Sequence, residues 1–202
     1  MMKLFGHPDS GHAYKVRFFL TAAAIPHQYE VADIWADRQS RQPEFKEHSR
    51  YGEVPLLIDG AHSLVQSNAI LLYLADRSGQ WGAQDPDTLQ TVREWLFWEA
   101  NKIGLCLPQL RAHQMFDTAR LSEGAHQWLS ERYAHDVGLL DKALSEGSGF
   151  IIGDQPTVAD FSLSAYLFYA DQAKVSVPPN VQHWLNALAR LPGWQPPETL
   201  LA

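Results

Sequence analysis

Hydrophobic and polar positions follow one pattern up to about residue 78 and another after residue 86. In the first part, short apolar runs alternate with stretches of helical periodicity. Strands are expected at Lys3-Leu4-Phe5, 28–32, 56–58 and 63–65, and helices at about 11–24, 40–48 and 67–77. This βαβαββα order, with a hairpin turn at Asp59-Gly60, predicts a small α/β sandwich.

The rest of the chain has helical periodicity and no strand signal. A segment rich in turn-forming residues, 78–86, predicts a linker. Beyond it, helices are expected at about 87–112, 117–144, 157–173 and 180–191, and Thr157 with Asp160 three residues later fits a capping box. The predicted organisation is an α/β domain over 1–78, a linker over 79–86 and an all-helical domain over 87–202.

Composition and charge narrow the function classes. The 202 residues are 46% hydrophobic and 19% charged, as in ordinary globular proteins. A formal net charge of −7 gives no basic surplus for nucleic acid or a membrane surface, so small molecules or proteins are the expected partners. The single cysteine, Cys106, excludes an internal disulfide, and no histidine pair has the spacing of a helical metal motif. Without a signal peptide or an apolar span, a cytoplasmic location is expected.

Three motifs, taken in order, carry a resemblance to a known family. Val54-Pro55 precedes the third strand, Gln66-Ser67-Asn68-Ala69-Ile70 opens the next helix, and Gly153-Asp154-Gln155-Pro156-Thr157-Val158-Ala159-Asp160 lies in the helical half. With the βαβαββα order, they make the chain resemble a cytosolic glutathione transferase over essentially its whole length. The resemblance implies a thioredoxin-like N-terminal domain, glutathione as cosubstrate with no permanently bound cofactor, and conjugation of glutathione to an apolar electrophile or reduction of a peroxide.

Ser10 is the candidate catalytic residue. The stretch from Pro8 to Val16 resembles the serine-type transferases, whose hydroxyl at this turn donates a hydrogen bond to the glutathione sulfur. A free cysteine thiol has a pKa near 8.5, and a hydroxyl donor at a helix N-terminus favours the thiolate. The other interpretation of Ser10 is a plain helix N-cap. His12 either touches the thiolate, as part of the electrophile pocket, or is an exposed histidine of the first turn.

The resemblance also implies how glutathione is held. A cis peptide bond at Val54-Pro55 would turn the backbone of Val54 toward the cysteinyl backbone of the ligand, in the manner of an added strand. Gln66 and Ser67, at the start of a helix, would hold the γ-glutamyl end. The alternatives are an edge-strand or turn proline without a ligand and a serine that only caps its helix.

Glu53 departs from the family pattern. Relatives commonly carry lysine or glutamine at this position, near the glycyl carboxylate of glutathione, and a like charge there would repel that group. Arg41 is the expected compensating cation because its planar fork matches a carboxylate, with Arg38 and Lys46 as alternatives. All three also fit the interpretation of solvated surface charges.

The remaining candidates concern the second substrate and the subunit state. Trp98 and Asn101 are candidates for the electrophile pocket, although core or interface packing also fits Trp98. Tyr51, before Gly52-Glu53-Val54-Pro55, resembles an aromatic residue that inserts into the partner subunit in some related dimers, so a homodimer is implied; packing on its own domain is the alternative. Two other functions stay open: a transferase-like binding or regulatory protein without turnover, and a thiol-disulfide reductase that uses glutathione.

Overall fold

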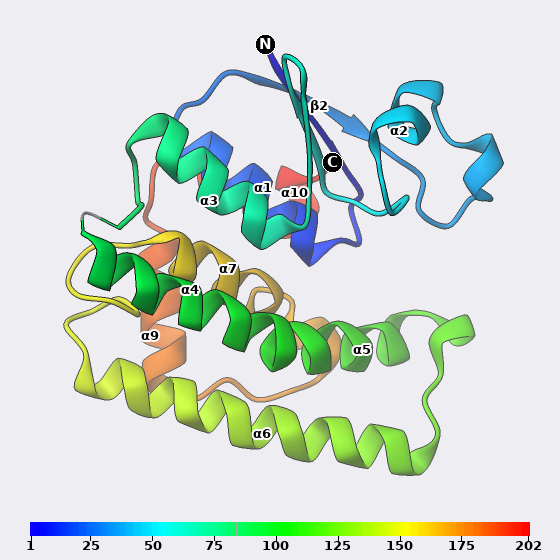
Figure 1. Cartoon of the computed structure of the whole chain (residues 1–202). Helices are drawn as coiled ribbons and strands as arrows, with labels where there is room; N and C mark the ends of the chain where they lie inside the picture. The colour runs from blue at the N-terminus through cyan, green and yellow to red at the C-terminus, as the bar shows by residue number, and fades with distance from the viewer. Residues whose placement is uncertain (84) are drawn as a thin grey trace. The chain divides into compact units, whose positions relative to one another are not determined.

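The computed structural model describes residues 1–83 and 85–202, which form two compact units (Figure 1). Residues Met1–Gly82 and Leu191–Ala202 make one unit, and Ala83–Arg190 make the other. We call them the sheet unit and the helical unit. The expected assignment of 87–202 to a single helical domain is therefore corrected, because residues 191–202 belong to the sheet unit.

The sheet unit is built around a four-stranded mixed sheet in the order β2-β1-β3-β4. Its strands are β1 (Met2–Gly6), β2 (His27–Val31), β3 (Leu56–Asp59) and β4 (His62–Val65). Strand β1 is parallel to β2 and antiparallel to β3, and β3 is antiparallel to β4. With α1 (Gly11–Ala22), α2 (Pro43–His48) and α3 (Ser67–Ser78), the predicted βαβαββα order is confirmed.

Strand register brings four chain segments to one end of this sheet. Leu56, the first residue of β3, pairs with Phe5 of β1 and with Val65 at the end of β4. Phe5 also pairs with Glu30, near the end of β2. The chain therefore leaves β1, β2 and β4 and enters β3 at the same end, which we call the Ser10 end of the sheet.

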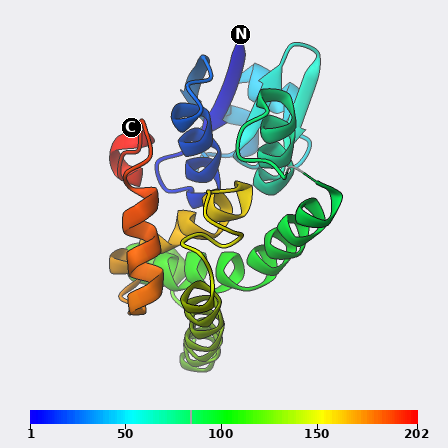
Figure 2. The same cartoon turned by 90° about the vertical axis from the view of Figure 1, so that its left-hand side faces the viewer.

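Apolar side chains cover both faces of the sheet. Phe5, Phe45 of α2 and Leu56 are completely buried in one cluster, and the rings of Phe5 and Phe45 lie 5.6 Å apart. Because side chains alternate along a strand, Leu4 and its partner Leu57 face the opposite side. Helices α1 and α3 run side by side against the sheet (Figure 2). The resulting layers are those of the predicted α/β sandwich.

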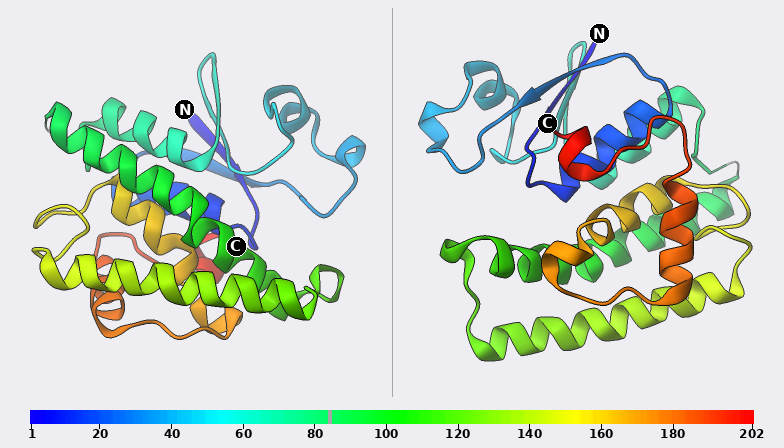
Figure 3. Two further views of the ribbon diagram at one scale, coloured as in Figure 1. Left: turned by 60° about the horizontal axis from the view of Figure 1, so that its bottom comes forward. Right: turned by 180° about the vertical axis from the view of Figure 1, so that it is seen from behind.

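The C-terminal segment packs on α1 and β2. The Tyr14 hydroxyl donates to the carbonyl of Gln195 at 2.9 Å, and the Tyr29 hydroxyl donates to the carbonyl of Leu201 at 3.3 Å. Burial raises the pKa of Tyr29 to about 12, while the Arg17 guanidinium lies over its ring at 3.6 Å. Helix α10 (Pro197–Leu200) consequently lies beside α1, as the rear view in Figure 3 shows.

The helical unit divides its chain more finely than the sequence predicted. Its helices are α4 (Pro86–Asn101), α5 (Ile103–Met115), α6 (Glu123–Glu146), α7 (Val158–Leu167), α8 (Ala170–Ala173) and α9 (Pro179–Leu188). The helix expected over 87–112 is two helices, because Lys102 has non-helical φ and ψ of −121° and −96°. Pro108 lies inside α5. Within the described parts of the chain, no helix combines the length and apolarity needed to cross a membrane.

Asp160 connects three segments of the helical unit. Thr157 caps α7, and the predicted capping box with Asp160 is confirmed. The completely buried Asp160 carboxylate also accepts hydrogen bonds from the Ile151 backbone N–H at 3.0 Å and the Trp184 indole at 2.8 Å. One side chain thus joins the loop before α7, the start of α7 and helix α9.

We predict that Asp160→Asn lowers the free energy of unfolding by at least about 3 kcal/mol, because buried N–H donors lose a charged acceptor and face an amide that also donates. Urea denaturation measures the change. Asp154→Asn is the matched control, since Asp154 is exposed in the same loop. Equal stabilities of the two variants would contradict the role assigned to Asp160.

Candidate functional site

Ser10 sits between β1 and α1. Its backbone is extended, with φ −100° and ψ 102°, and its Oγ accepts a hydrogen bond from the backbone N–H of Ala13 at 3.1 Å. Helix α1 begins at the next residue, so Ser10 is the N-cap. A hydroxyl that accepts one hydrogen bond keeps its own proton for donation. The cap and the catalytic interpretation are therefore compatible in one side chain.

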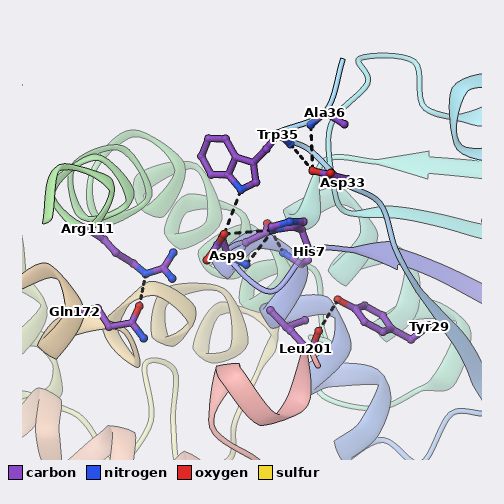
Figure 4. Close-up of polar contacts among 11 residues, drawn as sticks. His7, Asp9, Tyr29, Asp33, Trp35, Ala36, Arg111, Gln172 and Leu201 are labelled. Carbon is purple, nitrogen blue, oxygen red and sulfur yellow. Dashed lines mark hydrogen bonds and ion pairs between the residues drawn. The ribbon is translucent and has the colours of Figure 1, made fainter. Parts of the chain in front are cut away.

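The turn after β1 and the segment after β2 form a polar network that the sequence did not reveal, and Figure 4 shows its members Asp9, Asp33 and Trp35. The Trp35 indole donates to Asp9 Oδ2 at 3.2 Å, and the Asp9 backbone N–H donates to His7 Nδ1 at 3.2 Å. Asp33 Oδ1 accepts from the Trp35 backbone N–H at 2.9 Å. The segment after β2 is thereby tied to the turn that carries Ser10. Asp33 two residues before Trp35 is a turn signal, but its pairing with the Ser10 turn depends on strand register.

Val54 lies just before β3, and the Val54–Pro55 peptide bond is cis. Its side chain packs against the cluster that contains Phe5 and Leu56. Because the strand ladder begins only at Leu56, the backbone of Val54 lies outside the sheet, at the Ser10 end. The carbonyl of the preceding residue, Glu53, accepts from Ser49 Oγ at 3.1 Å.

Gln66 and Ser67 follow β4 at the same end. Gln66 has φ +68° and ψ 107°, an unusual backbone conformation for a residue other than glycine. Strained backbones of this kind cost on the order of 1–3 kcal/mol and are often found at functional sites. Ser67 is the buried first residue of α3, so its backbone N–H belongs to the first turn, whose amides have no intrahelical acceptor. The Gln66 amide donates to Glu53 Oε2 at 3.5 Å.

The cations proposed for the glycyl carboxylate are engaged with the backbone. Arg41 donates to the carbonyls of Ile34, Ala36 and Gly52, and Arg38 donates to the carbonyl of Tyr51. Lys46 donates to the carbonyl of Gln39 at 2.7 Å. The two arginines hold the segment before Val54 against the segment after β2. In the structure Arg41 shapes the loop before Val54, and its contact with the glycyl carboxylate of glutathione stays a prediction.

The other predicted residues are spread over both units. His12 is in the first turn of α1 and partly buried. Tyr51 is 44% exposed, with the Arg50 guanidinium 5.9 Å from its ring centroid. In α4, the Trp98 ring meets the Trp95 ring edge-on, with centroids 5.3 Å apart, and the backbone carbonyl of the exposed Asn101 accepts a hydrogen bond from the Arg132 guanidinium at 3.3 Å. Their roles in an electrophile pocket or a dimer stay predictions.

Comparison with known families identifies the chain. Residues 1–76 match the model of the glutathione S-transferase N-terminal domain, and residues 123–187 match the model of the C-terminal domain. The chain belongs to the glutathione S-transferase family. Its two-domain plan, predicted from the sequence, is that of this family, and the N-terminal match contains Ser10, Val54, Gln66 and Ser67.

Individual relatives of this transferase-family chain have different names. It is 26% identical to the disulfide-bond oxidoreductase YfcG of Escherichia coli, over 93% of this chain and 89% of that protein. It is also 26% identical to a maleylacetoacetate isomerase of Pseudomonas aeruginosa, over 87% and 84% of the two chains. A crystal structure of a possible glutathione S-transferase from Rhodopseudomonas palustris superposes with a TM-score of 0.87 at 27% identity, covering 98% of each chain. The family is thus established, whereas the named reactions differ.

We predict that Arg41→Gln lowers the free energy of unfolding by about 2 kcal/mol, because backbone carbonyls lose a charged donor. Thermal and urea denaturation measure it. Arg50→Gln, at an exposed position of the same unit, should change little and serves as the control. Unchanged stability of Arg41→Gln together with weaker glutathione binding would indicate that Arg41 contacts the ligand instead.

Proposed function

We propose that the chain is a glutathione transferase that binds glutathione at the Ser10 end of its sheet. The supporting observation is the strand register, which brings Ser10, Val54 and Gln66-Ser67 to that end from β1, β3 and β4. Strands lie about 4.8 Å apart, so β1 and β4, with β3 between them, are separated by roughly 10 Å. An extended tripeptide has about this length. Glutathione can therefore reach from the first turn of α3 to Ser10.

Each segment would contact a different part of glutathione. The first-turn amides and hydroxyl of Ser67 suit a carboxylate, so the γ-glutamyl end would lie there with Gln66 beside it. The backbone of Val54, outside the ladder, would pair with the cysteinyl backbone as an added strand does. The cysteinyl sulfur would then face Ser10 at the start of α1.

Ser10 would favour the thiolate of glutathione. Its Oγ accepts from Ala13, so the hydroxyl proton is directed to another acceptor, and the positive end of the α1 dipole favours a negative sulfur. The thiolate attacks an electrophilic carbon, a carbon–sulfur bond forms, and the bond to the leaving group breaks with its electron pair. Serine forms no covalent intermediate in this scheme. His12, Trp98 and Asn101 remain the proposed contacts of the apolar electrophile.

We predict that Ser10→Ala changes glutathione affinity by less than about threefold but lowers kcat/KM by about a hundredfold, because the lost hydrogen bond acts on the developing nucleophile. The pKa of the bound thiol, measured by ultraviolet absorbance of the thiolate, should rise toward that of free glutathione.

Loss of an N-cap alone destabilises a helix by about 1 kcal/mol. Ser122→Ala provides the control, because Ser122 caps α6 through Ala125 and lies in the helical unit. It should leave the thiol pKa unchanged. Binding of glutathione without turnover of any electrophile by the wild type would instead support the binding-protein alternative, and no binding at millimolar glutathione would overturn the proposal.

A reductase function is the second candidate, favoured by the name of the E. coli relative. The first turn of α1 carries no cysteine here, so a disulfide substrate would have to react with the glutathione thiolate itself. Assays of a mixed disulfide and of an alkyl or aryl halide, run side by side, separate the two reactions.

We propose in addition that the chain forms a homodimer through Tyr51. This aromatic side chain is 44% exposed and precedes Gly52, whose φ of +67° fixes the bend of the loop. An exposed aromatic on a firmly held loop is well suited to fill a pocket of a second copy.

Tyr51→Ser should convert the dimer to a monomer at micromolar concentration, because the aromatic contact area is lost on both sides of a symmetric interface. Sedimentation velocity measures the change. Trp128→Ser removes an aromatic that is 50% exposed on α6 and should leave the dimer intact. A monomeric wild type would contradict the proposed dimer.

A further inference from the structure

The Glu53 carboxylate lies on the β4 side of Val54. Its Oε2 is 3.5 Å from the amide nitrogen of Gln66, and both side chains are exposed. Gln66 directly precedes Ser67, the first residue of α3. The carboxylate is therefore next to the helix start at which the proposed function puts the γ-glutamyl end of glutathione. The sequence alone instead predicts that Glu53 faces the glycyl carboxylate, at the opposite end of glutathione.

Among the residues that the structure describes, no ion pair joins the Glu53 carboxylate to a lysine or arginine. Every lysine and arginine of the sheet unit, all of whose residues the structure describes, contacts another group: Lys3 (Glu30 and Glu44), Lys15 (Asn68), Arg17 (Tyr29), Arg38 (Tyr51), Arg41 (Gly52), Lys46 (Gln39), Arg50 (the Tyr51 ring) and Arg77 (Asp59). Among the described residues, the side-chain partner of the Glu53 carboxylate is the neutral Gln66 amide, at the long limit of a hydrogen bond. A carboxylate has about four acceptor positions, so it has capacity for a cationic donor.

The γ-glutamyl end of glutathione is zwitterionic. Its α-carboxylate suits the first-turn amides of α3, and its α-ammonium suits an acceptor of opposite charge a few ångströms away. Glu53 supplies that charge beside Gln66. A negative group next to an anion site would be unfavourable for a simple anion, whereas it is complementary to an amino acid end, which carries both charges.

We propose that Glu53 binds the α-ammonium group of glutathione and makes the site specific for thiols with a free α-amino acid end. The assignment rests on the proposed glutathione site and adds the residue that selects for the ammonium group. It also reverses the expected sign of the contribution of Glu53, from repulsion of the glycyl carboxylate to attraction of the ammonium.

The test measures the affinity of wild type and Glu53→Gln for three ligands by calorimetry. The ligands are glutathione, N-acetylglutathione, which lacks the ammonium charge, and the glycyl monoethyl ester of glutathione, which lacks the glycyl carboxylate. Glu53→Gln should lower the affinity for glutathione and the affinity for the ester by about tenfold each. This is the size expected for the loss of a charge-assisted hydrogen bond. Its affinity for N-acetylglutathione should stay within about twofold of wild type.

Two controls separate this contact from general electrostatics. Glu47→Gln makes the same charge change at an exposed position on α2 and should bind all three ligands like wild type. High salt should reduce the difference between wild type and Glu53→Gln, because an exposed ion pair is screened. Equal thermal midpoints of the two Gln variants and wild type verify that the fold is retained.

The contrary results are distinct. Tighter binding of glutathione by Glu53→Gln, with the ester preferred by wild type, would overturn the assignment and place Glu53 at the glycyl end. If Glu53→Gln lowered the affinity for all three ligands equally, the assignment would also be overturned, because the ammonium group would then play no part in the contact. Both results leave the glutathione site itself standing. If wild type binds none of the three ligands at millimolar concentration, the proposed function fails together with this inference.

Discussion

The pairing of Leu56 with Phe5 on one side and Val65 on the other is the constraint on which the candidate site depends. A shift of one residue would turn Leu56 away from Phe5 and Phe45, with which it is completely buried. Core packing therefore enforces the strand register. The register in turn decides which chain segments lie at the Ser10 end of the sheet. The hydrophobic side chains of β1 and β3 thus position polar groups that they do not touch.

Polar contacts then give each loop at the Ser10 end its shape. Arg41 and Arg38 hold the segment before Val54 through backbone carbonyls, and Trp35 is bonded to Asp9, next to Ser10. Arg38 and Arg41 are engaged with backbone carbonyls, whereas the start of α3 and the neighbouring Glu53 carboxylate together present charges of both signs. Such a distribution suits a molecule whose end carries both an ammonium and a carboxylate group.

The sequence predicted most of the fold because periodicity, turn residues and caps act locally. The βαβαββα order and the Thr157–Asp160 capping box are examples. The division of the helix expected over 87–112 depends on the backbone angles of Lys102, and the return of residues 191–202 to the sheet unit depends on tyrosine hydroxyls that meet distant carbonyls. Neither has a local signal. For the same reason the contacts of Arg41 and Glu53 could not be predicted: their side-chain directions follow from loops that tertiary contacts shape.

The most direct test of the account is a titration of the isotope-labelled protein with glutathione, followed by backbone amide chemical shifts. We predict the largest changes at Ser10, Val54, Gln66 and Ser67, and no change at Gly60, in the hairpin at the opposite end of the sheet. Changes confined to other parts of the chain, or equal changes at Gly60 and Val54, would contradict a glutathione site built by the strand register.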